Sequence, residues 1–158
     1  MLYKSDITRT LKSPFGTSPT RRNKYERVGV KFDEVYNIVL QAQDAALAAI
    51  RPGVKAKDLD AAARKVFASA RLKSAPDLKL ADHFTHGIGH GIGLEIHEAP
   101  RVRSNSEDVL ENGMVITIEP GIYIPGWGGV RIEDDILVTP HGPHLLTTLP
   151  REAMSLAE

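Results

Sequence analysis

The sequence predicts an α+β fold, with helices on one face of a curved and mainly antiparallel sheet. Two observations support this prediction. Residues 33–72 carry apolar side chains at helical spacing, and after residue 82 the chain changes to short strand-like segments punctuated by Gly and Pro. At 158 residues, the chain is expected to form a single domain over residues 1–158.

The N-terminal residues predict a short strand followed by a loop. Residues 2–10 alternate between two faces, with Tyr3 on one face and Asp6 on the other. Residues 11–31 are rich in Pro, Gly, Ser and positive charge, so we expect a loop there. The basic run at 21–24 is interpreted as part of this solvated loop rather than as a phosphate site.

Two amphipathic helices are predicted next, over residues 33–50 and 58–72. Asp33 is expected to cap the first helix, and the Arg-Pro-Gly sequence at 51–53 is expected to end it. A polar loop is predicted over 73–82. The inward faces consist of Val35, Ile38, Val39, Ala42, Ala45, Ala46 and Ala49 in the first helix and Leu59, Ala62, Ala63, Val66, Phe67 and Ala70 in the second.

Four strands are predicted in the second half, over residues 84–98, 114–119, 129–138 and 144–149. The segment between the second and third of these strands is long enough to make them antiparallel neighbours. Side chains alternate across a strand, so Glu119 and Glu133 are expected to converge on one concave face. Inward acids in apolar strands are costly unless they are paired or bind a metal ion.

The composition excludes several kinds of protein and site. Twenty basic and twenty acidic residues give a net charge of zero, which argues against nucleic acid or an anionic membrane as the main partner. The absence of cysteine excludes disulfides and thiolate metal sites. Neither a signal peptide nor a membrane span is predicted, and we expect a cytoplasmic protein.

Three histidines, His86, His90 and His97, occur around a run of alternating glycines at 87, 89, 91 and 93. These glycines do not fit a dinucleotide-binding register, and no helical pattern follows them. We expect them to let the backbone approach a ligand or cofactor closely. Hydrolysis at a metal centre requires neutral imidazole, carboxylates and nearby histidines for proton transfer, and this half of the chain carries all three.

Each of these residues also has a simpler interpretation. A single His is more often a hydrogen-bonded core residue than a ligand, and Glu119 precedes Pro-Gly and could be a turn residue. The acidic run at 133–135 could be a solvated edge or a set of oxygen ligands that prefers calcium. Taken together, the residues predict a metal site.

The same motifs resemble the pita-bread metallopeptidases: Xaa-Pro dipeptidase (prolidase), aminopeptidase P and methionine aminopeptidase. Residues 86–100 (HGIGHGIGLEIHEAP), 112–123 (NGMVITIEPGIY) and 129–138 (GVRIEDDILV) are most similar to the prolidase branch. Residues 5–10 (SDITRT) resemble the family's second aspartate strand. The family's first aspartate belongs one strand upstream of Asp6, so the resemblance implies an N-terminally truncated, incomplete pita-bread domain.

The resemblance implies a role for each candidate residue. The metal ligands would be Asp6, His90, Glu119 and Glu133, with Asp6 and Glu133 bridging two ions in complete members. Because His90 and Glu119 serve one ion only, we expect one well-held ion and a second that is weak or absent. Manganese is expected, with cobalt, iron or zinc as alternatives.

The remaining site residues would act on the substrate. The resemblance implies that His97 contacts the scissile peptide and transfers protons, and that His86 lines the substrate pocket. Glu119 orients the attacking hydroxide, Arg101 holds a dipeptide carboxylate, and Arg131 pairs with the carboxylates of the site. Thr117 would supply a hydroxyl behind the ligands.

The predicted function is a metal-dependent peptidase that hydrolyses a short Xaa-Pro peptide, impaired by the loss of the first aspartate. Two alternatives are a non-catalytic binding protein or truncated remnant on the same fold, and a module that binds an ion without hydrolysis. Since an unpaired sheet edge beside Asp6 would invite pairing with another chain, a homodimer is a further hypothesis.

Overall fold

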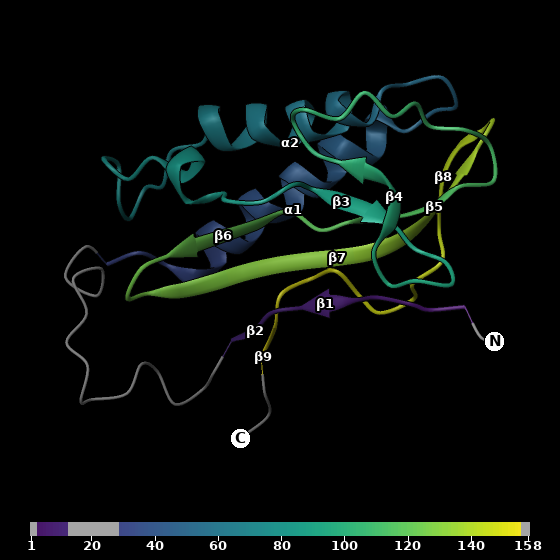
Figure 1. Ribbon diagram of the computed structural model, residues 1–158. Helices are drawn as coiled ribbons and strands as arrows, with labels where there is room; N and C mark the ends of the chain where they lie inside the picture. The colour runs from purple at the N-terminus through teal and green to yellow at the C-terminus, as the bar shows by residue number, and fades with distance from the viewer. Residues whose placement is uncertain (1–2, 13–28, 156–158) are drawn as a thin grey trace.

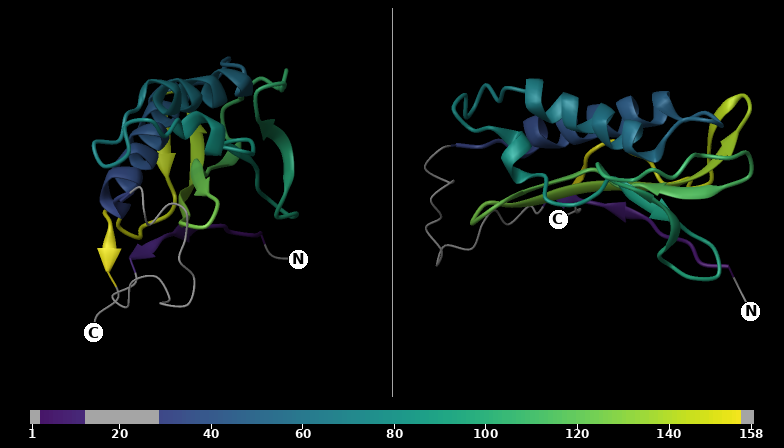
Figure 2. Two further views of the ribbon diagram at one scale, coloured as in Figure 1. Left: turned by 90° about the vertical axis from the view of Figure 1, so that its left-hand side faces the viewer. Right: turned by 45° about the horizontal axis from the view of Figure 1, so that its top comes forward.

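The computed structural model describes residues 3–12 and 29–155. Two helices, α1 (Phe32–Ala49) and α2 (Ala56–Ser69), pack against each other and cover one face of a curved sheet (Figure 1). No described helix lies on the opposite face (Figure 2). The predicted α+β architecture is therefore confirmed.

The long strand β7 (Gly128–Thr139) organises the main sheet, which has seven strands in the described residues. Its neighbours are β1 (Thr8–Arg9), β5 (Val115–Ile118), β6 (Gly121–Ile124) and β8 (Gly142–Leu145), all antiparallel to it. Beyond β5 follow β3 (Gly89–Gly91) and β4 (Glu98–Val102). A separate pair, β2 (Leu11–Lys12) and β9 (Met154–Ser155), is parallel.

Both helices lie close to their predicted positions, but the predicted cap is wrong. Lys31 is the N-cap residue of α1, and its side chain makes no capping hydrogen bond. Asp33 lies in the first turn instead, where a negative charge is favourable beside the helix dipole and 3.3 Å from the Lys12 ammonium. After α1, Gly53 takes a φ of 89°, which Gly adopts without strain. No described helix has the length and apolar character needed to cross a membrane.

The core lies between the helices and the sheet. The predicted helix faces supply Val35, Val39 and Ala46 from α1 and Leu59 and Phe67 from α2, all essentially without exposed surface. Each large aliphatic or aromatic side chain buried in this way contributes about 1.5–3 kcal/mol relative to remaining exposed. Members of the core that the apolar pattern did not include are Tyr36, Gln43, Leu47 and Asp60.

Several predicted strand boundaries are wrong. The strand predicted over 2–10 is a ladder of two residues, and Leu11 and Lys12, where a loop was predicted, form β2. Residues 21–24 lie outside the described residues. The last residues of the loop predicted over 73–82 belong to a 3-10 helix, η2 (Leu80–His83).

The glycine-rich segments account for the other errors. The range 84–98, predicted as one strand, contains β3 and only the first residue of β4, and the residues between β3 and β4 form a loop. The segment predicted as a connection contains β6, because the chain turns only after Ile124 and returns as β7. The strand predicted over 144–149 is β8, which lies two residues earlier and ends at Leu145.

A buried polar network fixes the N-terminal segment to the sheet and to α1. The Asp134 carboxylate, which has no exposed surface, accepts hydrogen bonds from Arg9 (2.6 Å), Gln43 (2.9 Å) and Thr147 (2.5 Å). The Arg9 guanidinium also donates to the backbone carbonyls of Thr8, Glu133, Leu149 and Pro150. Strand β1, which contains Arg9, is therefore held close to β7.

Candidate metal centre

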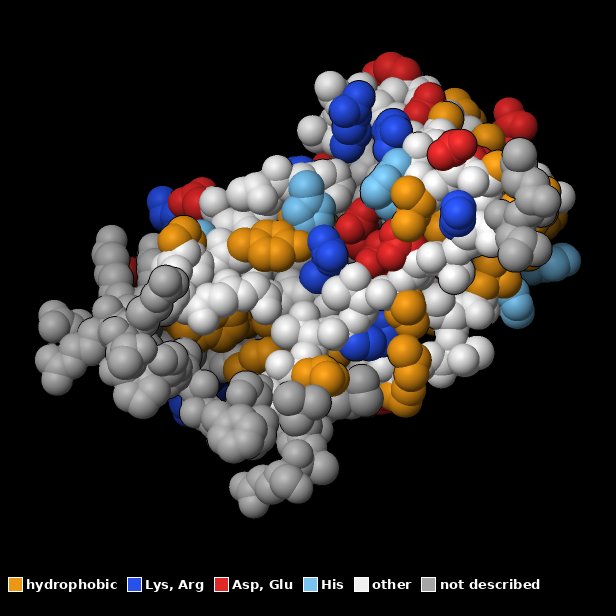
Figure 3. All heavy atoms as spheres, turned by 60° about the horizontal axis from the view of Figure 1, so that its bottom comes forward, with side chains coloured by type: hydrophobic (Ala, Val, Ile, Leu, Met, Phe, Trp, Pro, Cys, Tyr) orange, Lys and Arg blue, Asp and Glu red, His pale blue; other side chains and the backbone are white. Residues whose placement is uncertain are grey.

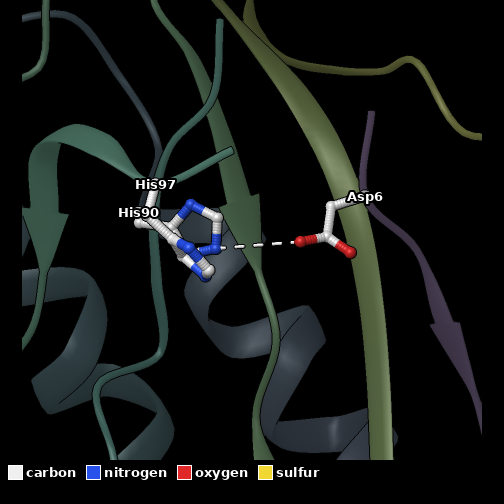
Figure 4. Close-up of side chains that lie close together, drawn as sticks. All are labelled: Asp6, His90 and His97. Carbon is white, nitrogen blue, oxygen red and sulfur yellow. Dashed lines mark ion pairs between the residues drawn. The ribbon is translucent and has the colours of Figure 1, made fainter. Parts of the chain in front are cut away.

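The structure brings the four residues predicted as metal ligands together on the face of the sheet that the helices leave uncovered. Ligand atoms of His90, Glu119 and Glu133 all lie within 4.8 Å of one another, and those of Asp6, His90 and His97 form a second such group. The His90 Nε2 atom is 3.5 Å from Glu119 Oε1. It is also 4.0 Å from Asp6 Oδ2, a contact drawn in Figure 4. Their proposed role as ligands rests on this geometry.

Strand register explains why the two glutamates meet. In the β5–β7 ladder Thr117 is the partner of Asp135, and the same register carried two residues further sets Glu119 opposite Glu133. The Glu119 backbone N–H donates to the carbonyl of Ile88 at 2.6 Å, which fixes the end of β5 next to the start of β3. The predicted convergence of the two acids is thus a direct result of the two-residue period of strands.

The His90 ring is oriented by its own strand. Its Nδ1 atom is 3.0 Å from the carbonyl of Gly91, a contact in which Nδ1–H donates and Nε2 is left with a free lone pair facing the acids. The backbone N–H of His90 donates to Thr117 Oγ1 at 3.1 Å. Thr117 thus supports His90 from behind, as the resemblance implied.

The alternating glycines serve strand packing. A Cβ atom at Gly89 would lie 1.9 Å from the carbonyl oxygen of Thr117, and one at Gly91 would lie 2.0 Å from that of Ala99. These glycines therefore let β3 approach β5 and β4 closely. At both positions the nearest backbone belongs to the protein itself, and Gly89 in addition lines a cavity beside the cluster.

The acids of the cluster are buried, and the nearby positive charge does not compensate their negative charges. Burial, followed by repulsion from Glu133, raises the pKa of Glu119 to about 7, and Arg131 opposes this increase. Burial also raises the pKa of Glu133, although a hydrogen bond from Thr8 counteracts it. Burial lowers the pKa of His90, which favours the neutral ring that a metal ion requires. This donor set fits a divalent cation, which would compensate the buried carboxylates.

A cavity of about 710 Å³ opens beside the cluster, and Figure 3 shows acidic side chains at the bottom of a hollow bordered by histidine and basic side chains. Every residue predicted to be catalytic or substrate-binding lines it: His86, His97, Arg101, Glu119 and Arg131. The His97 and His90 ring centroids are 4.3 Å apart, and Arg131 Nη1 is 3.8 Å from Glu119 Oε2.

The structure adds residues behind His86 that the sequence analysis missed. The Tyr123 hydroxyl is 3.0 Å from His86 Nε2, and Arg64 donates to the His86 carbonyl at 2.9 Å. Arg64 is in turn paired with the buried carboxylate of Asp60. The i, i+4 spacing of Asp60 and Arg64 on a helix was a usable signal. Tyr123 carried none, because its segment was interpreted as a connection.

One of the simpler interpretations can now be judged. The acidic run of Glu133, Asp134 and Asp135 is not a solvated edge, since these residues are 2%, 0% and 5% exposed. Because side chains alternate along a strand, Asp135 shares a face of β7 with Glu133, but the sequence analysis gave it no role. Its Oδ2 accepts the backbone N–H of Asp6 at 3.1 Å, whereas its Oδ1 has no hydrogen-bond partner among the described residues.

Comparison with known proteins gives consistent results. The model of metallopeptidase family M24 matches residues 1–140. The Xaa-Pro dipeptidase of Pyrococcus furiosus is 46% identical over 96% of this chain, and the match spans 38% of that protein. Solved relatives include a prolidase from Pyrococcus horikoshii OT3 (TM-score 0.75, 47% identity over 96% of this chain and 38% of that one) and an Xaa-Pro dipeptidase from Bacillus anthracis (TM-score 0.76, 43% identity over 98% and 38%). The chain thus spans about 38% of the length of the relatives it matches.

Proposed function

Because the chain belongs to metallopeptidase family M24, we propose that it carries the metal-binding part of a peptidase that cleaves Xaa-Pro dipeptides. The observation that carries this proposal is the convergence of His90, Glu119 and Glu133 within 4.8 Å at the edge of a cavity. The substrate class comes from the name of the Pyrococcus furiosus relative, an Xaa-Pro dipeptidase that matches 96% of this chain. A single domain over residues 1–158 is part of the proposal.

The residues proposed to hold the ion are Asp6, His90, Glu119 and Glu133. One imidazole and three carboxylates form a donor set that suits manganese, with cobalt, iron or zinc as alternatives. Both groups of donor atoms include His90, and a neutral imidazole offers one lone pair, which favours one ion over two. When bound, a divalent ion lowers the pKa of a water ligand and polarises a carbonyl.

The chain's own residues would orient the substrate and move protons. Glu119, itself one of the proposed ligands, would also orient the attacking water. His97 is exposed, adjoins His90 and lines the cavity, so it can donate a hydrogen bond to the scissile carbonyl. His86, held by Tyr123, also lines the cavity.

The two arginines supply positive charge for the substrate carboxylate and for the acids. Arg101 lies on β4 beside His90 in the register, and its backbone N–H is fixed by Asp108 at 2.8 Å. Its guanidinium is exposed and donates to the His97 carbonyl at 3.3 Å, so it is available to hold the C-terminal carboxylate of a dipeptide. Arg131 lies next to Glu119 and would limit the repulsion among the carboxylates.

The test is hydrolysis of Xaa-Pro dipeptides by the purified, manganese-loaded protein. His90→Ala should abolish turnover, whereas His141→Ala, a matched change at an exposed histidine outside the cavity, should leave it unchanged. Calorimetric titration with Mn²⁺ should show binding that depends on His90 but not on His141. Binding without turnover would favour the non-catalytic alternative, and absence of binding would refute the metal site itself.

A further inference from the structure

Strand β7 changes partners at Asp135, in the middle of its length. Its ladder with β1 pairs Thr8 with Glu133, and the same register carried two residues further sets Asp6 opposite Asp135. The backbone carbonyl of Asp135, however, accepts the N–H of Leu146 at 2.9 Å, because β7 is already turning towards its pairing with β8. The backbone N–H of Asp6 therefore finds its acceptor in the Asp135 side chain, at 3.1 Å.

A similar substitution of a side chain for the backbone occurs at the other end of the same ladder. There the Thr10 hydroxyl accepts the N–H of Arg131 at 2.9 Å and donates to its carbonyl at 3.0 Å. The β1 ladder thus contains two residue pairs, with a side-chain contact at each end. Of these two contacts, the one at Asp135 lies on the side of the metal centre.

The gap between the diverging strands is open. A cavity of about 470 Å³ lies there, lined in part by Asp135, Ser5, Ile7, Ile92 and Val115. The next described backbone contact upstream is between the Lys4 N–H and the Gly93 carbonyl, at 2.8 Å. Asp6 lies between that contact and the β1 ladder, and among the described residues its backbone N–H is bound by the Asp135 carboxylate.

Asp135 is an unexpected residue for such a position. It is 5% exposed, and its Oδ1 has no hydrogen-bond partner in the described part of the chain. A buried carboxylate with an unsatisfied oxygen is costly, and an apolar residue of similar size would avoid that cost. This cost indicates that the side chain has a purpose other than stability.

Its neighbours connect Asp135 to the candidate metal centre on two sides. On one side it holds Asp6, whose Oδ2 is 4.0 Å from His90 Nε2. On the other side its ladder partner is Thr117, which accepts the N–H of His90. We propose that Asp135 is a positioning residue, which places the Asp6 carboxylate at the metal centre through the Asp6 backbone N–H. This inference rests on the proposed function in one respect, namely that Asp6 is a metal ligand.

Two substitutions separate the hydrogen bond from the volume of the side chain. Asp135→Asn retains an oxygen that can accept the Asp6 N–H, and Asp135→Leu removes every acceptor at similar size. Loss of a residue that orients a metal ligand typically weakens metal binding by roughly 10–100-fold. We therefore expect Asp135→Leu to raise the Kd for Mn²⁺ by about that factor and Asp135→Asn to stay within about threefold of the unmodified protein. Asp77→Leu, at an exposed aspartate in another loop, is the matched control and should have no effect.

The second readout is independent of the metal. In ¹⁵N–¹H spectra of the metal-free protein, the Asp6 amide proton should move upfield in Asp135→Asn and further in Asp135→Leu, because the acceptor loses its charge and is then removed. This readout remains available from Asp135→Asn if Asp135→Leu does not fold. Equal Kd values for Asp135→Leu and the unmodified protein would overturn the inference, and so would equal weakening by Asn and Leu. If the unmodified protein binds no Mn²⁺, the proposed function fails, whereas the amide shift still tests the contact between Asp135 and Asp6.

Discussion

Removal of the Asp134 carboxylate should be among the most destabilising single changes in this protein. Asp134 is fully buried and accepts hydrogen bonds from Arg9, Gln43 and Thr147, which belong to three different parts of the chain. Asp134→Ala would leave the Arg9 guanidinium, itself 5% exposed, without its counter-charge, and it would leave the Gln43 amide without one of its acceptors. Breaking a buried ion pair from one side typically costs about 3–5 kcal/mol.

The lower end of that range is the better expectation. The guanidinium of Arg9 retains four backbone carbonyl acceptors, so the loss leaves it uncompensated in charge but still hydrogen-bonded. We expect a loss of about 3 kcal/mol in the free energy of unfolding, compared with a total of about 5–15 kcal/mol for a typical domain. At a urea dependence of about 2 kcal/mol per M, the midpoint should fall by roughly 1.5 M.

The assay is urea unfolding of the metal-free protein followed by circular dichroism, so that changes in metal affinity do not contribute. Asp44→Ala, which breaks the surface pair with Arg151, is the control and should cost about 0–1 kcal/mol. The double variant Arg9→Met/Asp134→Leu removes both charges. Its loss in the free energy of unfolding should be smaller than the sum of the losses for Arg9→Met alone and Asp134→Leu alone. A loss below about 1 kcal/mol for Asp134→Ala would show that this network does not hold the N-terminal segment.

Three further predictions concern the site. Gly89→Ala should unfold the protein or lower its thermal midpoint strongly, because the new Cβ would lie 1.9 Å from the Thr117 carbonyl oxygen. Gly113→Ala should lower the midpoint less, because its Cβ would meet no atom within 4 Å, although the φ of 91° remains unfavourable for Ala. Thr117→Val should cost about 1–3 kcal/mol in urea unfolding, since it leaves the His90 N–H without its acceptor, and an unchanged midpoint would contradict this contact. In EDTA the folded pKa of Glu119, about 7, lies above its ordinary value of 4.5, so its ionisation should reduce stability as pH rises through that interval. Glu119→Gln should therefore be more stable than the unmodified protein at pH 8 but not at pH 4, as measured by urea midpoints.

The sequence predicted best what depends on the period of an element. Glu119 and Glu133 were expected to meet because side chains alternate along strands, and the β5–β7 register brings them together. The inward positions of Val39 and Phe67 followed in the same way from the helical period. In these cases the backbone geometry alone determines direction, so that a pattern of residue types is sufficient.

What the sequence did not predict depends on contacts between distant segments. The hydroxyl of Tyr123 meets His86 because β6 pairs with β7, and the Gly and Pro residues around β6 are equally typical of a loop. Alternation along β7 puts Asp135 on the face of Glu133, but a face does not specify which neighbour the side chain contacts. That neighbour, the backbone of Asp6, is 129 positions away in the sequence.

The three consecutive acids of β7 show both what the strand period predicts and what depends on contacts between distant segments. Glu133, Asp134 and Asp135 are all buried, and each is bound by the segment just before β2: the Thr8 hydroxyl, the Arg9 guanidinium and the Asp6 N–H respectively. Alternation sends Asp134 towards α1 and its two neighbours towards the candidate metal centre. A run that could be interpreted as a solvated edge therefore binds residues 6–9 on both faces of the sheet.

Because residues 6–9 are bound on both faces of the sheet, contacts on the helix side of β7 are expected to affect metal binding on the other side. Arg9→Leu removes the contact on the helix side of β7 and leaves the Asp6 and Thr8 contacts on the other side intact. If residues 6–9 attach as one unit, this variant should raise the Kd for Mn²⁺ although Arg9 belongs to neither group of candidate ligands. Lys12→Leu, which removes a cation from an exposed ion pair nearby, should not. Titration calorimetry below the unfolding temperature of both variants distinguishes the cases, and an unchanged Kd for Arg9→Leu would mean that Asp6 is positioned from its own side of the sheet alone.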